Sequence, residues 1–293
     1  MAVPADQALI LLEGLYALVE SQSVVAAAAL LMHGILLLLF VLALFFLLRH
    51  HAEGQSIRVL LFTAILLAGF AIFQVVLDVA LVALPNTVLQ ICMKEGMSQR
   101  AMSLLETFAT IYNVRQGALA TNNAIADSLL LYRCYLIWAT SRYSRLVVAI
   151  PLLLILATAA IAYAAIYLVL DIRIPFGFAL LTNVVLLGLT GGRIWYKRRQ
   201  AAVLLGAAVV HRRYTATLEI IFESGLIYVA AVLIYLVSIS NSVPPFTTFQ
   251  NICWGSLAQL VNIVPMMIVV RVALSKTATP SDTAASSMHK EFV

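Results

Sequence analysis

The stretch that decides the fold is residues 24–48, VVAAAALLMHGILLLLFVLALFFLL, which contains 25 residues and no Asp, Glu, Lys or Arg. A helix that crosses the hydrocarbon core of a bilayer, about 30 Å thick, needs roughly 20 mostly apolar residues. The leucine runs do not alternate with polar residues, as the strands of a membrane barrel do. Because lipid offers the backbone no hydrogen-bond partner, we expect a transmembrane helix here.

The composition of the whole chain points to the same environment. Of the 293 residues, 63% are hydrophobic and 11% are charged, whereas soluble domains carry about 45–50% apolar and about 25% charged residues. This balance excludes an ordinary soluble domain, a disordered chain and a disulfide-stapled small protein. The net charge of +5 is typical of the positive-inside bias of membrane proteins, so we expect no nucleic-acid partner.

Six further stretches have the length and apolarity of a membrane span. We predict an all-α fold, a seven-transmembrane helix bundle at 24–274, with an extracellular N-terminal segment at 1–23 and a disordered cytoplasmic tail at 275–293. The third span is the most polar, so we expect it to face other helices, and Met102–Gln116 is a candidate extension of its helix. The predicted spans are Val24–Leu48, Val59–Leu84, Ala118–Trp138, Leu146–Leu170, Phe176–Tyr196, Ala216–Val237 and Ile252–Leu274.

Basic residues predict how the bundle is oriented. Lys and Arg gather in the loops after spans one, three and five and in the C-terminal segment, whereas no Lys or Arg precedes Arg49. Short basic loops stay in the cytoplasm, so we place the N-terminus outside and the C-terminus inside, with the plasma membrane as the expected compartment. The basic loop 197–213 has two interpretations. It is either an orientation signal attracted to anionic membrane lipid or a docking surface for a cytosolic signalling partner.

Charged residues inside the predicted spans are candidates for function, because burying them in a bilayer is costly. At about 1.5 Å per residue, Arg133 lies roughly 8–9 Å inside the cytoplasmic end of span three, at the depth of Glu219 and Glu223 in span six. We therefore predict an ion pair between Arg133 and one of these acids. This pair either fixes the packing of the helices or acts as a switch that opens when the bundle rearranges.

A second group of polar residues is predicted near the middle of the membrane. Asp127 lies in span three, Asn183 in span five and Asn262 in span seven. These side chains are expected to form a polar intramembrane layer together with Asn122 and Asn123. The layer either holds water or a cation, or simply joins the helices by hydrogen bonds worth about 0.6–2 kcal/mol each.

A proline, two cysteines and the histidines allow further predictions. Pro265, inside span seven, removes a backbone hydrogen bond and is expected to kink the helix. Cys92 and Cys253 both fall on the predicted outer side, where a disulfide between them is permitted. The histidines have no metal-ligand spacing, and no nucleotide-binding or hydrolase motif occurs, so we expect no metal, no cofactor and no enzymatic activity.

Four stretches between residues 127 and 274 are similar to motifs of a known family. They are DSLLLYRCYLIW at 127–138, TGGRIWYKRR at 190–199, ESGLIY at 223–228 and PMMIVVRVAL at 265–274. As a set they resemble a large group of seven-transmembrane proteins from mushroom-forming basidiomycete fungi. The resemblance implies the span count and topology of G-protein-coupled receptors and supplies no ligand. Tyr132-Arg133-Cys134 is similar to the acidic-Arg-aromatic motif of such receptors, with Tyr132 in place of the acidic residue.

Two functions follow from these features. The leading hypothesis is a receptor-like protein that transmits a signal across the membrane in response to an unknown small ligand. The alternative is a transporter or channel for a small polar solute or a proton, with Asp127, Asn183 and Asn262 along its path. Against a transporter, the sequence shows no internal repeat of the kind that many transporters carry.

Overall fold

The structure is a computed structural model that describes residues 5–49, 55–139, 144–168, 170–205, 225–240 and 244–277. Within these ranges every regular element is an α-helix and there is no strand, so the predicted all-α class is confirmed. The helices are α1 (Ala5–Arg49), α2 (Gln55–Glu95), α3 (Gln99–Trp138), α4 (Ser144–Leu168), α5 (Arg173–Leu205), a helix at Gly225–Ser240, here called the 225–240 helix, and α7 (Pro244–Thr277).

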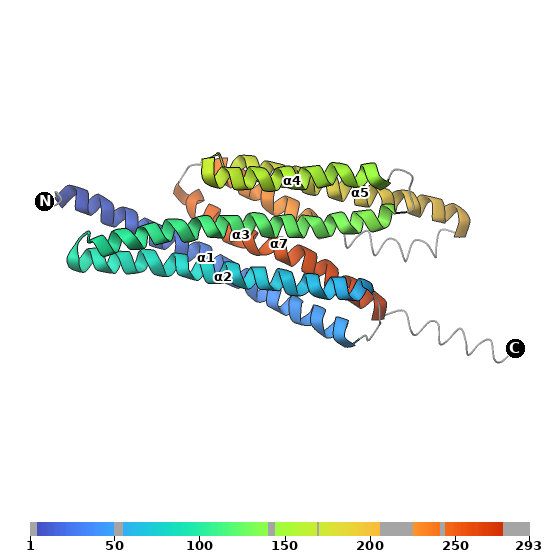
Figure 1. Cartoon of the computed structure of the whole chain (residues 1–293), viewed down its shortest axis with the longest axis horizontal. Helices are drawn as coiled ribbons and strands as arrows, with labels where there is room; N and C mark the ends of the chain where they lie inside the picture. The colour runs from blue at the N-terminus through green and yellow to red at the C-terminus, as the bar shows by residue number, and fades with distance from the viewer. Residues whose placement is uncertain are drawn as a thin grey trace.

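The helices lie side by side along one long axis, and consecutive helices run in opposite directions (Figure 1). The beginning of α1 and the end of α7 consequently lie at opposite ends of the molecule. α3 packs against α2, α4, α5 and α7, while α7 packs against α1, α2 and α3. These two helices therefore form the centre of the bundle.

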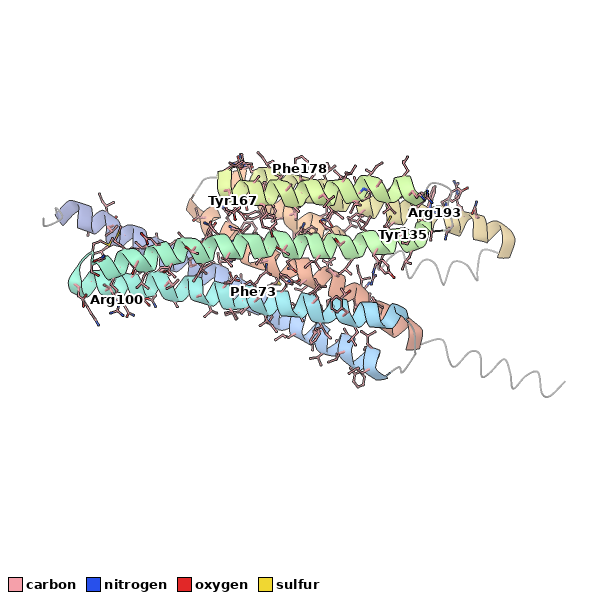
Figure 2. All side chains as sticks on the ribbon, in the orientation of Figure 1. Phe73, Arg100, Tyr135, Tyr167, Phe178 and Arg193 are labelled. Atoms are coloured by element: carbon pink, nitrogen blue, oxygen red, sulfur yellow. The ribbon has the colours of Figure 1, made fainter. Side chains whose placement is uncertain are left out.

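Burial follows this arrangement. In its most apolar window α7 has 72% of its residues buried, against 22% in α1 and in α4. The outer faces carry large apolar side chains, such as Phe73 on α2 at 45% exposure and Tyr167 on α4 at 81% (Figure 2). An apolar exterior around a partly polar centre is what lipid requires of a helical bundle.

Five of the described helices, α1, α2, α4, α5 and α7, are long and apolar enough to cross a membrane. The two other predicted spans do not meet that standard. The 225–240 helix is shorter in its described part. α3 is more polar because its buried face carries Arg115, Asn122 and Asp127, which point into the bundle. Hydropathy along a sequence does not record which way such side chains point.

The first three helices extend beyond the predicted spans. α1 begins at Ala5 and continues through Val24 without a break, so the described part of the N-terminal segment predicted at 1–23 is helical and continuous with the first span. α2 passes through Pro85 to Glu95, and α3 begins at Gln99, so the candidate extension of the third span is helical. At 45 residues and about 1.5 Å per residue, α1 is about 68 Å long, more than the roughly 40–45 Å of a whole bilayer.

Packing between the first three helices explains why they continue. Leu15 of α1, Val88 of α2 and Ala101 of α3 form a small buried cluster near their shared end. The side chain of Ser98 accepts a hydrogen bond from the backbone N–H of Ala101 and begins α3. In Figure 1 this end of α1, α2 and α3 projects past α4 and α5.

Candidate functional site

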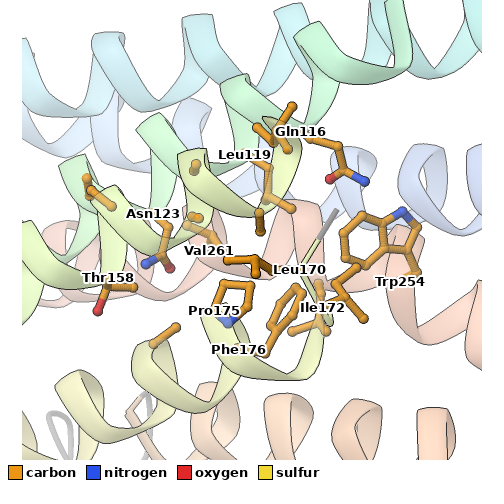
Figure 3. Close-up of a pocket in the computed structure, with 18 of the residues that line it drawn as sticks. Gln116, Leu119, Asn123, Thr158, Leu170, Ile172, Pro175, Phe176, Trp254 and Val261 are labelled. Atoms are coloured by element: carbon orange, nitrogen blue, oxygen red, sulfur yellow. The ribbon is translucent and has the colours of Figure 1, made fainter. Parts of the chain in front are cut away.

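A cavity of about 370 Å³ opens among α3, α4, α5, the 225–240 helix and α7 (Figure 3). It lies toward the end of the bundle where α4 connects to α5, since Leu170 and Ile172 of that connection line it. This is also the end at which α1 begins (Figure 1). Small side chains on three helices leave the space open; they are Ala120, Ala124, Ala159, Ala162, Ala165 and Ala179.

The lining of the cavity is uncharged. Apolar side chains cover most of it, and no Asp, Glu, Lys, Arg or His is among the described residues that line it. Figure 3 shows Gln116 and Trp254 on one side of the cavity and Asn123 and Thr158 on the opposite side. The wall suits a neutral molecule, because a charge placed here would lose its hydration without gaining an opposite charge.

Below the cavity lies a group of hydrogen-bonded side chains that we call the polar floor: Asn123, Asp127, Asn183 and Tyr228. The Tyr228 hydroxyl donates to Oδ1 of Asn123 at 2.9 Å, and Nδ2 of Asn123 donates to Oδ2 of Asp127 at 3.0 Å. Nδ2 of Asn183 donates to Oδ1 of Asp127 at 3.2 Å and to the carbonyl of Ala179 at 3.0 Å. The floor thus joins α3, α5 and the 225–240 helix.

Two polar floor residues also face the cavity. Asn123 and Tyr228 line it, while Asp127 lies beneath them with 2% exposure. Between α4 and α5, the hydroxyls of Thr158 and Thr182 lie 3.0 Å apart, and Thr158 faces the cavity as well. A molecule in the cavity can therefore touch side chains whose hydrogen bonds connect four elements.

An aromatic cluster borders the other side of the cavity. The Phe176 ring lies 5.0 Å from Tyr235 and 5.7 Å from Trp254, and Tyr235 lies 5.4 Å from Trp254, measured between centroids. Cζ of Arg115 lies 5.4 Å from the centroid of the Trp254 ring. Phe176 and Trp254 face the cavity, so this cluster connects its wall to Arg115.

Arg115 also forms a buried ion pair with Asp78 of α2, Nε of the arginine meeting Oδ1 of the acid. Both side chains are at most 4% exposed. Sequence reasoning missed this pair because it placed Arg115 outside the third span and Asp78 near the outer end of the second. The depth comparison applied to Arg133 would have found it, had the third helix been continued past its apolar segment to include Arg115.

The structure brings together part of the predicted intramembrane layer. Asp127 and Asn183 are hydrogen bonded, with Asn123 on the other oxygen of Asp127. Asn262 is not part of this group. It is fully buried, and neither its amide nitrogen nor its oxygen has a hydrogen-bond partner among the described residues.

The structure describes only the arginine of the predicted switch pair. Arg133 lies near the end of α3, five residues before Trp138, and is half-buried. Glu219 and Glu223 lie outside the described residues, so their pairing with Arg133 stays a prediction. Pro265 lies inside α7 and is buried, and the kink there stays a prediction.

The cysteines do not form the disulfide that their predicted position on the outer side would permit. Cys92 and Cys253 both carry free thiols. The physical reason is that the two cysteines pack in different hydrophobic clusters. Cys92 packs with Leu15 and Val88 at the projecting end of α1 and α2, whereas Cys253 packs with the cluster that contains Tyr235 and Trp254.

The opposite end of the bundle carries aromatic and basic side chains together. Cζ of Arg193 lies 4.7 Å from the centroid of Trp138, whose Nε1 donates to the carbonyl of Leu189 at 3.2 Å. Cζ of Arg199 lies 4.9 Å from the centroid of Trp195. Of the basic loop 197–213, residues up to Leu205 continue α5 and the rest lie outside the described residues. Trp and Tyr beside basic residues are typical of a membrane interface.

Comparisons with known proteins return no relative: no protein family, no curated protein and no solved structure matches this chain.

Proposed function

We propose that the protein crosses the membrane seven times, with its N-terminus outside, and acts as a receptor-like protein for a small, neutral, amphiphilic molecule. The observation that carries this proposal is the uncharged cavity with the polar floor beneath it. Pockets of about 300–1,000 Å³ with an apolar wall and a few placed polar groups are the usual form of a small-molecule site.

Several features support the proposed topology. Five helices have the length and apolarity of membrane spans, and α3 together with the 225–240 helix runs along the same axis (Figure 1). The ends of the described chain lie at opposite ends of the bundle. The basic and aromatic residues around Arg193 and Arg199 fit the cytoplasmic interface that the charge distribution predicts.

The chemistry of the cavity favours one class of ligand. Its alanine-rich wall suits an apolar body, and Asn123 and Tyr228 suit a hydroxyl, amide or ester group at one end. A charged head group is disfavoured because the cavity offers no opposite charge. Such a ligand reaches the site from the outer solution or from the outer leaflet.

A signal can pass from this cavity through the polar floor. A ligand that hydrogen bonds with Asn123 or Tyr228 competes with the bonds that join α3, α5 and the 225–240 helix. A ligand shifts an equilibrium only by its difference in affinity for the two states, and these bonds supply such a difference. The cytoplasmic ends of the same helices would then present Arg133 and the basic loop 197–213 to a cytosolic partner.

A carrier or channel for a small polar solute or proton is the second candidate. It is favoured by the polar side chains that continue below the cavity, from Asn123 to Asp127 and Asn183. In that case the polar floor would be a gate along a path open to each side in turn, and the cavity would be reached from both sides of the membrane.

A pair of probes tests the ligand site in the full chain reconstituted in lipid nanodiscs. Bromoundecanol should quench the fluorescence of Trp254 saturably, because Trp254 lines the cavity, and Trp254→Phe should remove that component. Bromoundecanoate, which carries a charge, should bind at least about tenfold more weakly, a difference of about 1.4 kcal/mol. Equal binding of the two probes would contradict a neutral site.

Matched substitutions on α4 separate the cavity from the lipid around it. Ala162→Phe fills the cavity and should abolish saturable quenching, whereas Ala160→Phe, on the exposed face of the same helix, should leave it unchanged. Quenching that survives Ala162→Phe would show that the probe reaches Trp254 from the bilayer and would overturn the proposed site.

A further inference from the structure

Four fully buried carboxamides lie between helices, and each has at least one polar atom without a hydrogen-bond partner among the described residues. We call them the amide layer: Gln74 on α2, Asn122 on α3, and Gln259 and Asn262 on α7. Gln74 is 1% exposed and the other three are 0% exposed. Nitrogen and oxygen are both unpartnered in Gln74, Asn122 and Asn262, and the nitrogen is unpartnered in Gln259.

The position of this layer along the bundle can be given relative to the ion pair of Arg115 and Asp78. Gln74 lies four residues from Asp78, and Asn122 seven residues from Arg115 on the same face of α3. At about 1.5 Å per residue these offsets are about 6 and 10 Å, both toward the cytoplasmic end, because α2 and α3 are antiparallel.

α7 brings its amides to the same level. Trp254 lies beside Arg115, and α7 runs in the same direction as α3 (Figure 1). Gln259 and Asn262, five and eight residues further on, therefore lie about 8 and 12 Å below Arg115. Oε1 of Gln259 lies 3.5 Å from Nδ1 of His33, which brings α1 to the edge of the layer.

The layer is bounded below by apolar packing. One hydrophobic cluster lies next to the amide layer on the side away from the ion pair. It includes Ala71 of α2, Ile125 of α3, and Ile263 and Met266 of α7. The amides are thus enclosed between this cluster and the ion pair, and they belong to neither the cavity lining nor the polar floor.

The unpartnered atoms at this level include donors and acceptors in similar number. The acceptors are Oε1 of Gln74, Oδ2 of Asp78, and Oδ1 of Asn122 and Asn262, and the donors are the amide nitrogens of the four carboxamides and one terminal nitrogen of Arg115. An ion would need partners of one sign, and Asp78 already has its counter-charge in Arg115. Water donates and accepts, so it can satisfy both kinds.

We propose that the amide layer is a hydration site: a cluster of water molecules held between α2, α3 and α7 and connecting Asp78 and Arg115 to Gln259. Hydrogen bonds through water can change partners without leaving an amide unpaired. The contact of α7 with α2 and α3 is therefore adjustable at this level, in contrast to the direct bonds of the polar floor. The proposal does not depend on the ligand or on the proposed function.

Solid-state NMR of the full chain in bilayers tests this proposal through transfer of magnetisation from water to side-chain amides labelled with ¹⁵N. Asn122 and Asn262 should receive water magnetisation several-fold faster than Asn183, a buried asparagine bonded to Asp127 and to the carbonyl of Ala179. The signals are assigned through correlation with each residue's own backbone, so no substitution is required.

Two results would overturn the hydration site. If transfer to Asn122 and Asn262 is as slow as to Asn183, the layer is dry. If their resonances shift when sodium is replaced by potassium, or chloride by bromide, an ion occupies it instead. Fast transfer with no dependence on the ion supports water.

Discussion

The polar floor and the amide layer are two buried groups of polar side chains in the same bundle, and they differ in how their hydrogen bonds are satisfied. In the polar floor each oxygen of Asp127 accepts a hydrogen bond from an asparagine. The bonds from Asn183 to Asp127 and from Tyr228 to Asn123 cross directly between helices. In the amide layer three of the four carboxamides have no partner for either polar atom within the part of the chain that the structure describes. Direct bonds fix the relative position of helices, whereas an amide layer that depends on water leaves them free to adjust.

The largest loss of stability is expected from breaking the ion pair of Arg115 and Asp78, next to the amide layer. Arg115→Met should lower the free energy of unfolding by about 3–5 kcal/mol, because it leaves the carboxylate of Asp78 buried without its counter-charge. Denaturant unfolding of the protein in detergent micelles measures this loss. The control is the double variant with Asp78→Leu, which removes both charges and should recover most of the loss. A double variant as unstable as Arg115→Met alone would contradict a paired role for these residues.

Breaking the polar floor at its centre should have the next largest effect. Asp127→Leu leaves the amides of Asn123 and Asn183 without their common acceptor, and each unsatisfied group costs about 1–3 kcal/mol. Because Asn183 still donates to the carbonyl of Ala179, we expect a loss of about 2–4 kcal/mol of unfolding free energy, less than two full penalties, together with weaker quenching by bromoundecanol. Unchanged stability would show that the floor does not hold these helices together.

A matched pair of substitutions compares the two regions directly. Asn183→Leu should cost about 1–3 kcal/mol, because it removes a direct bond to Asp127 and leaves an acceptor unsatisfied. Asn262→Leu should change stability by less than about 1 kcal/mol, because water can rearrange around the remaining amides. Both variants are measured by the same unfolding assay. Equal losses would remove the distinction between the regions.

The smallest loss of stability is expected from a substitution at the edge of the polar floor. Tyr228→Phe removes one hydroxyl that donates to Asn123 and keeps the ring, so the expected loss is about 1 kcal/mol. Tyr235→Phe, in the adjacent aromatic cluster, is the comparison variant. Thermal unfolding of the two variants side by side gives the difference. A larger loss for Tyr235→Phe would place the important hydroxyl in the aromatic cluster rather than in the floor.

The all-helical fold could be predicted because lipid imposes it on uninterrupted apolar segments such as 24–48. The contact between Asp127 and Asn183 was also within reach, because helix rise alone sets their depths. The position of Asn262 was not, since depth does not say around which side of α7 a residue lies. The pair of Arg115 with Asp78 was missed because the predicted third span began at Ala118, where hydropathy rises, whereas packing continues α3 back to Gln99.

Labelling of the cavity from each side of the membrane separates a receptor-like site from a transport path. Cys92, Cys134 and Cys253 are replaced by alanine, Ala162→Cys is introduced in the cavity lining, and a membrane-impermeant maleimide is applied to right-side-out and to inverted vesicles. A cavity closed by the polar floor should be labelled only from the side that carries the N-terminus, and bromoundecanol should protect it. Labelling from the side of the C-terminal tail, or from both sides, would contradict a receptor-like site closed by the polar floor.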